Sequence, residues 1–390
     1  MKRIGLKSSW LAALALVSLG GCTTVTDWIA PAVIDPPAEL QEIQERVAAQ
    51  SVWSRSLGGT DEQRLNLVPE YSQGRLYVAD ADGTVSALDA QTGRSLWSVE
   101  LDAPLSGGPG VGEGLVLLGT TDAEVIALSQ ADGSERWRAR VSSEVLSTPV
   151  AAFGRVVART IDGKVFGLDA ATGEHKWRYE REIPILTLRG TGSPVISGSS
   201  VLCGMSGGRL LALDIESGDV VWDAIVAVPS GRTELERLAD IDGDPLLMDG
   251  IAYVATYQGE VAAVGEHSGS LLWRRKFSSY AGMAADRYQV YASDADGFVW
   301  ALDADNGSAG WRQEALRNRQ LSDVATVGGL VAVGDFEGYV HFLSAEDGSL
   351  VGRTRVGSDP ITKGMLVAEG LLFVLGDGGK LEALRLSPLR

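Results

Sequence analysis

One phrase returns seven times along this chain of 390 residues, and it limits the fold more than any other feature. Each copy has an apolar run that ends near Leu-Asp-Ala, a polar turn that closes on Gly and, in six copies, a Trp four residues later. The six complete pairs are Gly93 and Trp97, Gly133 and Trp137, Gly173 and Trp177, Gly218 and Trp222, Gly269 and Trp273, and Gly307 and Trp311. The seventh copy has Gly348 but carries Gly352 in place of the Trp.

The spacing of these glycines predicts the architecture. From Gly93 onward they are 40, 40, 45, 51, 38 and 41 residues apart, a period typical of one four-stranded propeller blade. Within one period, residues 147–152, 155–160, 164–169 and 174–180 have strand-like composition and are separated by turn sequences. The repeat Gly suits a tight turn, and the Trp offers a flat surface for a neighbouring blade. The chain is therefore predicted to be all-β, with four-stranded antiparallel blades.

An eighth unit begins at Asp359, but the chain ends before its fourth, Trp-bearing strand. Residues 51–55, Ser-Val-Trp-Ser-Arg, lie just before the first blade and resemble the missing strand. We therefore predict an eight-bladed β-propeller over residues 51–390, with the ring closed by the N-terminal strand. Closure in this way also removes an exposed sheet edge.

The N-terminus predicts export and lipidation. Three basic residues precede an apolar run from Trp10 to Leu19, and Leu-Gly-Gly-Cys follows, which resembles a bacterial lipoprotein cleavage box. Residues 1–21 are thus predicted to be a signal peptide, and residues 22–50 a lipidated Cys22 with a tether. Thr23 follows the Cys, which favours the periplasmic side of the outer membrane. Residues 38–49 have helix-like apolar spacing but are too few for a stable isolated helix.

Charge and side-chain chemistry exclude several functions. The net charge is −17, and without the three basic residues of the signal it is −20, from 31 basic and 51 acidic residues. Such a surface disfavours nucleic acid, and contact with the membrane is predicted through the lipid anchor only. His175, His267 and His341 have no metal-site spacing and are predicted to lie at the surface, whereas Cys203 is predicted to be buried. No catalytic residue and no metal site is predicted.

The repeat around Gly93 resembles that of the quinoprotein alcohol dehydrogenases, eight-bladed propellers that hold pyrroloquinoline quinone with calcium. This resemblance implies an alternative function, a quinone-dependent dehydrogenase. However, those enzymes are much longer, and many carry a pair of adjacent cysteines that this chain lacks. The repeat supports the fold but not the cofactor, so no cofactor is predicted. A carbohydrate-binding propeller, with its ligand over the central channel, is a further alternative.

Essentially the whole chain resembles a second family, the BamB (YfgL) lipoproteins of the outer-membrane β-barrel assembly (BAM) complex. Residues 185–190 are similar to that family's Leu-x-Leu-Arg-Gly segment, and residues 233–242 to its Thr-Glu-x-x-Arg-Leu-x-Asp-x-Asp segment. The resemblance implies a non-enzymatic scaffold that binds the POTRA domains of BamA and assists folding and insertion of outer-membrane proteins. It implies partner contacts for Leu186, Leu188, Arg189, Asp240 and Asp242. Unfolded clients could also add a strand at exposed blade edges.

Spacing marks the same two segments independently. Trp and the next repeat Gly are 36 residues apart in the two early intervals, but 41 apart after Trp177 and 47 apart after Trp222. Both additions fall between the outer strand of one blade and the inner strand of the next, so they should emerge on one face and flank one blade. Apolar groups beside fixed charges suit a protein partner. In the alternative interpretation, the leucines pack inward and the carboxylates pair with arginines only to order the loop.

Overall fold

The computed structural model describes residues 36–59, 65–181, 192–229, 232–233, 238–257, 259–279 and 281–389. Every regular element within these ranges is a strand, and none of the described segments forms a helix long and apolar enough to cross a membrane. The compact unit that contains the strands spans Ala38–Arg390. Residues 1–35, which include Cys22, lie outside the described ranges.

The first four blades follow the chain in order, and each is an antiparallel sheet. Blade 1 contains β3 (Glu70–Ser72), β4 (Arg75–Ala79), β5 (Thr84–Asp89) and β6 (Ser95–Glu100). Blade 2 contains β7 (Leu105–Gly112), β8 (Leu115–Thr120), β9 (Glu124–Ser129) and β10 (Glu135–Arg140), and the short β2 (Asn66–Leu67) pairs in parallel with β7. Blade 3 contains β11 (Val150–Ala152), β12 (Arg155–Arg159), β13 (Val165–Asp169) and β14 (His175–Tyr179). Blade 4 contains β15 (Val195–Ser197), β16 (Ser200–Met205), β17 (Arg209–Asp214) and β18 (Val220–Ile225).

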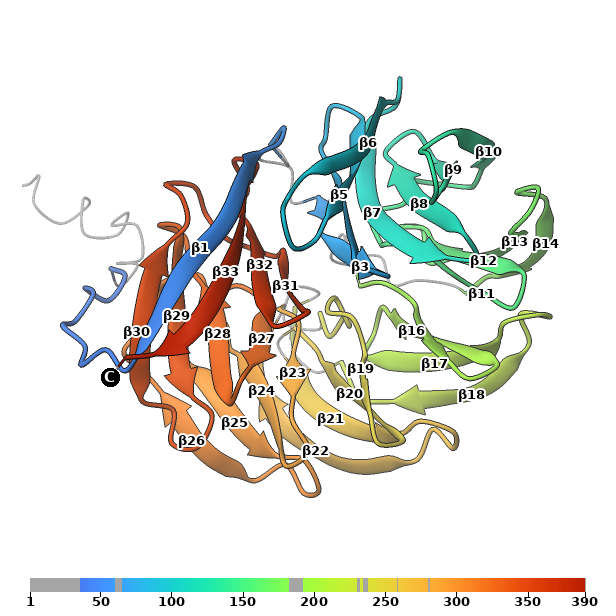
Figure 1. The fold of residues 1–390 in the computed structure, drawn as a ribbon. Helices are drawn as coiled ribbons and strands as arrows, with labels where there is room; N and C mark the ends of the chain where they lie inside the picture. Colours follow the sequence, from blue (N-terminus) through green and yellow to red (C-terminus); the bar gives the residue numbers. More distant parts are fainter. Residues whose placement is uncertain are drawn as a thin grey trace, which may run out of the picture. The chain divides into compact units, whose positions relative to one another are not determined.

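The remaining four blades complete the ring (Figure 1). Blade 5 contains β19 (Leu246–Met248), β20 (Ile251–Ala255), β21 (Gly259–Gly265) and β22 (Leu271–Phe277). Blade 6 contains β23 (Ala284–Ala285), β24 (Gln289–Ser293), β25 (Val299–Asp303) and β26 (Ala309–Gln313). Blade 7 contains β27 (Val324–Val327), β28 (Leu330–Gly334), β29 (Tyr339–Ser344) and β30 (Leu350–Arg355). Blade 8 contains β31 (Met365–Ala368), β32 (Leu371–Leu375), β33 (Lys380–Pro388) and β1 (Val47–Ser56). The predicted eight-bladed propeller is confirmed.

The N-terminal strand closes the ring, as predicted. β1 runs antiparallel to β33, from Val47 opposite Pro388 to Ser56 opposite Lys380, and Figure 1 shows the blue strand beside the red one. β1 begins four residues before the predicted boundary at residue 51. Trp53 of β1 donates its indole N–H to the carbonyl of Ala90 at 2.9 Å. It thereby supplies blade 8 with the Trp that the C-terminal repeat lacks.

Neighbouring blades are joined by a repeated contact of Trp on Gly. Trp137 of blade 2 donates its indole N–H to the carbonyl of Ala170 in blade 3 at 2.8 Å. Its ring covers Gly173, where a Cβ would lie 2.6 Å from the ring. Gly173 also has φ of +74°, which L side chains rarely adopt, so both the contact and the turn require glycine. The same pairing of one blade's Trp with the next blade's Gly recurs from Trp53 on Gly93 to Trp311 on Gly348.

Gly352 departs from the repeat because blade 8 is built differently. The blade that follows it has no β-turn between its last two strands, since these are β33 and β1 from opposite ends of the chain. The incoming chain occupies that space instead, and a Cβ at Gly352 would lie 2.7 Å from the carbonyl oxygen of Val47. The glycine therefore makes room for the closing strand.

Replacing Gly352 by alanine should lower the free energy of unfolding by about 1–3 kcal/mol, because the added methyl must displace the backbone of β1. Equilibrium chemical denaturation would measure the effect. Gly310→Ala, on the outer strand of blade 6, is the matched control, since its Cβ would meet the end of the Gln289 side chain at 3.1 Å. Equal stabilities for the two variants would contradict this explanation of Gly352.

The residues before β1 form an extended clasp on blade 7, with no helix over the helix-like residues 38–49. Arg319 donates from Nη1 to the carbonyl of Ala38 at 2.9 Å, and Arg353 donates from Nη2 to that of Gln41 at 3.2 Å. The N–H groups of Ala38 and Arg46 donate to the carbonyls of Arg317 and Val351. The start of the propeller unit is thus fixed by side chains from blade 7.

A buried charged cluster supports this clasp. Arg319 and Asp335 are almost fully buried and form an ion pair at 2.7 Å, and Asp335 also contacts His341 Nε2 at 2.8 Å. Burial opposes ionisation of Asp335, but hydrogen bonds from His341 and Arg319 lower its pKa. Burial lowers the pKa of His341.

The prediction of a surface position was wrong for His341, which is 0% exposed, because its ring replaces an apolar residue in the blade interior. The predicted surface position is confirmed for His175 and His267, and the predicted burial of Cys203 is also confirmed.

Candidate functional site

Two long inter-blade segments flank blade 4. The first runs from the end of β14 at Tyr179 to β15, and the second from the end of β18 at Ile225 to β19. The predicted site residues Leu186, Leu188 and Arg189 lie in the first segment, outside the described residues. The second segment is described at residues 226–229, 232–233 and 238–245 and includes the predicted Asp240 and Asp242.

Asp240 and Asp242 lie beneath the surface, at 2% and 8% exposed. Asp240 Oδ1 accepts a hydrogen bond from the N–H of Gly207 in blade 4 at 2.9 Å, and its carbonyl accepts from the N–H of Tyr257 in blade 5 at 3.1 Å. Ile241 between them is fully buried in the core that these blades share. The Asp240 carboxylate therefore holds the segment in place, whereas Asp242 Oδ1 is buried without a hydrogen-bond partner among the described residues. The contribution of both carboxylates to partner binding stays a prediction.

The described ends of the two segments lie side by side. The N–H of Ser193 donates to Asp244 Oδ1 at 2.6 Å, and a Cβ on Gly192 would lie 3.1 Å from the carbonyl oxygen of Asp242. Arg159 of blade 3 donates from Nη1 to the carbonyl of Gly192 at 3.0 Å. The same contacts thus fix the end of each long segment, so a displacement of one segment would also displace the other.

These ends belong to a polar network that joins blades distant in the ring. Asn66 donates from Nδ2 to Ser193 Oγ at 3.3 Å and to Thr148 Oγ1 at 3.4 Å. Lys363, at the start of blade 8, donates to Asn66 Oδ1 at 3.2 Å. Residues that enter blades 2, 3, 4 and 8 can meet in this way only near the ring axis. We call Asn66, Glu70, Thr148, Arg159, Ser193, Asp242, Asp244 and Lys363 the axial network.

Carboxyl groups crowd this network. Burial raises the pKa of Asp242 to about 6, with a further contribution from Asp240, while Arg159 and Lys363 oppose the rise. Burial also raises the pKa of Asp244, and Lys363 opposes the rise. The pKa of Glu70 rises to about 7 through burial and the nearby charge of Asp244. These acids therefore hold protons at a higher pH than exposed carboxyls do.

Replacing Glu70 by glutamine should stabilise the protein by about 1–3 kcal/mol near pH 8. Because the folded-state pKa lies above the unfolded value, Glu70 is most favourable to folding below about pH 4.5. That contribution is lost as the pH rises toward 7. The gain should therefore vanish as the pH falls to about 4.5, as denaturation across this pH range would show. Glu216→Gln, at an exposed turn, is the control, and a gain for Glu70→Gln that does not change with pH would contradict the prediction.

Sequence reasoning missed Arg159, although the repeat contains a signal for it. When the second strands of the blades are aligned, six other blades have a small residue at the position of Arg159, and blade 8 has Leu375 there. The small residues are Ala79, Gly119, Gly204, Ala255, Ser293 and Gly334. A charged residue at that interior position predicts a polar partner nearby. Asn66, Ser193 and Lys363 have no comparable signal, because they lie in irregular segments between blades.

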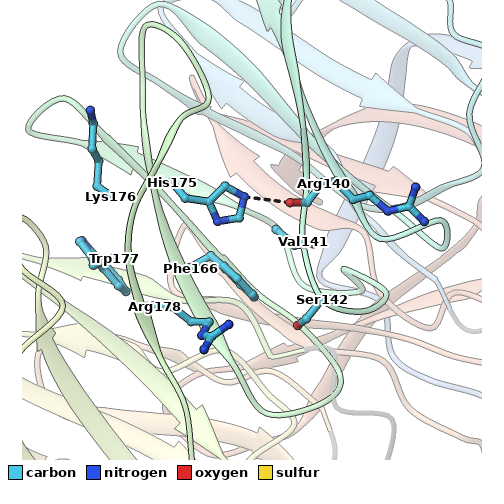
Figure 2. A pocket seen from close by; sticks show the side chains of 8 residues that line it. All are labelled: Arg140, Val141, Ser142, Phe166, His175, Lys176, Trp177 and Arg178. Atoms are coloured by element: carbon cyan, nitrogen blue, oxygen red, sulfur yellow. Dashed lines mark hydrogen bonds between the residues drawn. The ribbon is translucent and has the colours of Figure 1, made fainter.

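A shallow cavity of about 450 Å³ lies elsewhere, on the outer edge between blades 2 and 3 (Figure 2). The ring of His175 points toward the carbonyl of Arg140, to which Nε2 is 2.8 Å distant, and contacts Phe166 edge-on. Lys176 and Arg178, which also line the cavity, form ion pairs with Glu174 and Glu180. Among the described residues, no group of three or more His, Cys, Asp or Glu side chains is placed to hold a metal ion.

The fold defines the class of the protein, an eight-bladed propeller of quinoprotein-like repeats with two elongated segments beside blade 4. The quinohemoprotein alcohol dehydrogenase of Comamonas testosteroni has a similar structure, with a TM-score of 0.67. The match covers 86% of this chain and 76% of that one, at 14% sequence identity. A likeness at this identity shows the fold alone.

Closer relatives identify the family. A family model described as "Outer membrane protein assembly factor BamB" matches residues 49–104, 81–313 and 296–387. BamB of Pseudomonas aeruginosa is 51% identical, over 97% of this chain and 98% of its own, and BamB of Alkalilimnicola ehrlichii is 49% identical, over 96% and 95%. The crystal structure of BamB from Moraxella catarrhalis matches with a TM-score of 0.79 and 28% identity, over 87% of this chain and 100% of that one. The chain belongs to the BamB family of outer membrane protein assembly factors.

Proposed function

We propose that this chain is a non-enzymatic scaffold of the BAM complex that docks on the POTRA domains of BamA and assists the folding and insertion of outer-membrane proteins. The observation that carries the proposal is the contact between the two long segments, where Ser193 donates to Asp244 beside Gly192. Relatives that match nearly the full chain are named as outer membrane protein assembly factors, which supports this role.

The docking surface is assigned to the two long segments themselves. Leu186 and Leu188 would supply apolar contact, and Arg189 would supply a charge that sets the register of the partner. Asp240 is assigned a positioning role, because its hydrogen bonds hold the second segment against blades 4 and 5. Asp242 is buried near it and is assigned a part in the same positioning, through its attraction to Arg159.

The N-terminus is assigned to the membrane. Cleavage before Cys22 and lipidation of its thiol and amine, palmitate included, would hold the protein at the periplasmic side of the outer membrane. Residues 22–37 would serve as a tether, and the clasp on blade 7 would fix where the tether leaves the propeller unit.

The test is co-purification of BamA with the full-length chain from membranes, comparing wild type with Arg189→Ala and Asp242→Ala. Arg189→Ala should weaken BamA binding about tenfold or more, because central arginines often dominate protein interfaces. Asp242→Ala should weaken it through loss of segment position. Arg140→Ala, at an exposed position on blade 2, is the matched control and should bind BamA as wild type does. Failure of the wild-type chain to co-purify with BamA would refute the proposal.

A further inference from the structure

The outer edge of blade 4 is unusually apolar. β18 is the last strand of its sheet, and no described strand pairs with its outer side. Its side chains Val220, Val221 and Ile225 are 49%, 52% and 50% exposed. Three large apolar side chains on one unpaired strand are unusual for a soluble protein, because such an edge invites pairing with another chain.

Several other outer strands are protected by charge, although β6 also has a single charged side chain, Glu100. β10 carries Glu135, Arg136, Arg138 and Arg140, and β14 carries His175, Lys176 and Arg178. β22 also exposes two leucines at its start, but the lysine and two arginines that follow its Trp place charge along the rest of the strand. Charged side chains of this kind are a common device against unwanted strand pairing.

β18 has one charged side chain, and its charge is already paired. Asp223 accepts hydrogen bonds from Arg209 Nε at 2.9 Å and from Arg181 Nη1 at 2.9 Å. Arg209 lies on the neighbouring strand of the same blade, and Arg181 lies just after β14 of blade 3. Because two arginines already pair with Asp223, this carboxylate offers no attraction for a basic segment. The exposed Val220, Val221 and Ile225 favour apolar side chains instead.

The backbone of this edge is regular enough to accept a strand. The bulge in β18 lies between Val220 and Trp222, and from Trp222 to Ile225 each residue is paired in sequence with Ala212 to Arg209 of β17. Alternate N–H and C=O groups of such a stretch point away from the paired side. An added strand could bond to them whatever its sequence, while its side chains met Ile225 and Val221.

We propose that the outer edge of β18 binds an extended, uncharged polypeptide segment with apolar side chains at alternate positions, as a fifth strand of blade 4. The identity of the occupant rests on the proposed function, because strands of outer-membrane barrels have this alternating pattern. The strand ends at Ile225 and leads within three residues to Val228, itself exposed, in the second long segment. A client on this edge would therefore lie next to the surface assigned to BamA.

The test uses the full-length chain in detergent and a biotinylated peptide of about 12 residues in which Val or Leu alternates with Ser or Thr. Val221→Lys and Ile225→Lys should each weaken peptide binding about tenfold, since lysine removes apolar contact and adds charge at the edge. Leu96→Lys is the matched control, because Leu96 is also exposed and also precedes a repeat Trp, in β6. It should bind the peptide as wild type does.

A second peptide distinguishes strand addition from nonspecific apolar binding. Methylation of alternate backbone nitrogens removes the edge hydrogen bonds but keeps the side chains, so this peptide should not bind. Equal binding of the methylated and unmethylated peptides, or unchanged binding by Ile225→Lys, would overturn the inference.

BamA co-purification, measured on the same samples, distinguishes the two proposals. Val221→Lys and Ile225→Lys should retain BamA while losing the peptide, and Arg189→Ala should do the reverse. Loss of BamA together with the peptide in the β18 variants would assign this edge to the partner and overturn its assignment to clients. If the wild-type chain does not co-purify with BamA, the docking proposal is refuted. The peptide result would still decide the strand-addition proposal.

Discussion

Replacing Trp137 by alanine should lower the free energy of unfolding by about 3–5 kcal/mol, the range for removal of a large buried aromatic side chain. The indole is 8% exposed, belongs to the core shared by blades 2 and 3, and donates to the carbonyl of Ala170 at 2.8 Å. Its loss would leave a cavity over Gly173 and an acceptor without this donor. Equilibrium denaturation of the full-length chain in urea would measure the change in unfolding free energy.

The control for Trp137→Ala is Tyr288→Ala, which removes an aromatic ring that is 72% exposed. This substitution should change the stability by less than about 0.5 kcal/mol. Comparable losses in the two variants would show that the interface between blades does not depend on the Trp.

Replacing Arg319 by alanine should destabilise the protein by about 3–5 kcal/mol, because the buried Asp335 carboxylate would lose its principal cation. The same change removes the hydrogen bond to the carbonyl of Ala38. Proteolysis should therefore cut residues 38–46 more readily in the variant, in addition to the loss measured by denaturation.

Arg178→Ala provides the comparison for the buried arginine. Arg178 also pairs with a carboxylate, that of Glu180, but both side chains are largely solvent-exposed. Exposed pairs of this kind contribute little, so the expected loss is less than about 1 kcal/mol. A wild-type cutting pattern at residues 38–46 in Arg319→Ala would contradict the assignment of this residue to the clasp.

Much of the fold could be predicted because each blade repeats the same local pattern. The spacing of Gly and Trp predicts eight blades, and Trp53 predicts the closing strand. In the structure the ring of Trp53 covers Gly93, as the repeat Trp covers the repeat Gly between other blades. The clasp before β1 could not be predicted in this way. It depends on a hydrogen bond between Arg319 and the backbone of Ala38, and any residue has a carbonyl group to offer.

The candidate site was less predictable than the fold. Unequal spacing marks both long segments, but it does not say which of their charges are buried. Asp240 and Asp242 belong to a loop that is acidic in sequence, yet they face Gly207 and the axial network inside the protein. The partners of this network come from blades far apart along the chain, so no local pattern reveals them.

The pairing of β1 with β33 also sets an order of events when the chain is made. The first strand of the propeller leaves the ribosome before any other, and its partner leaves last, with Ser54 and Lys380 separated by 326 positions. The seven other blades can assemble through contacts with their neighbours, as in other repeat proteins. Blade 8 must wait for β33, and during that wait β1 has no partner strand. A nascent chain halted just short of β33 would thus remain an open arc, with its earliest strand still without a partner.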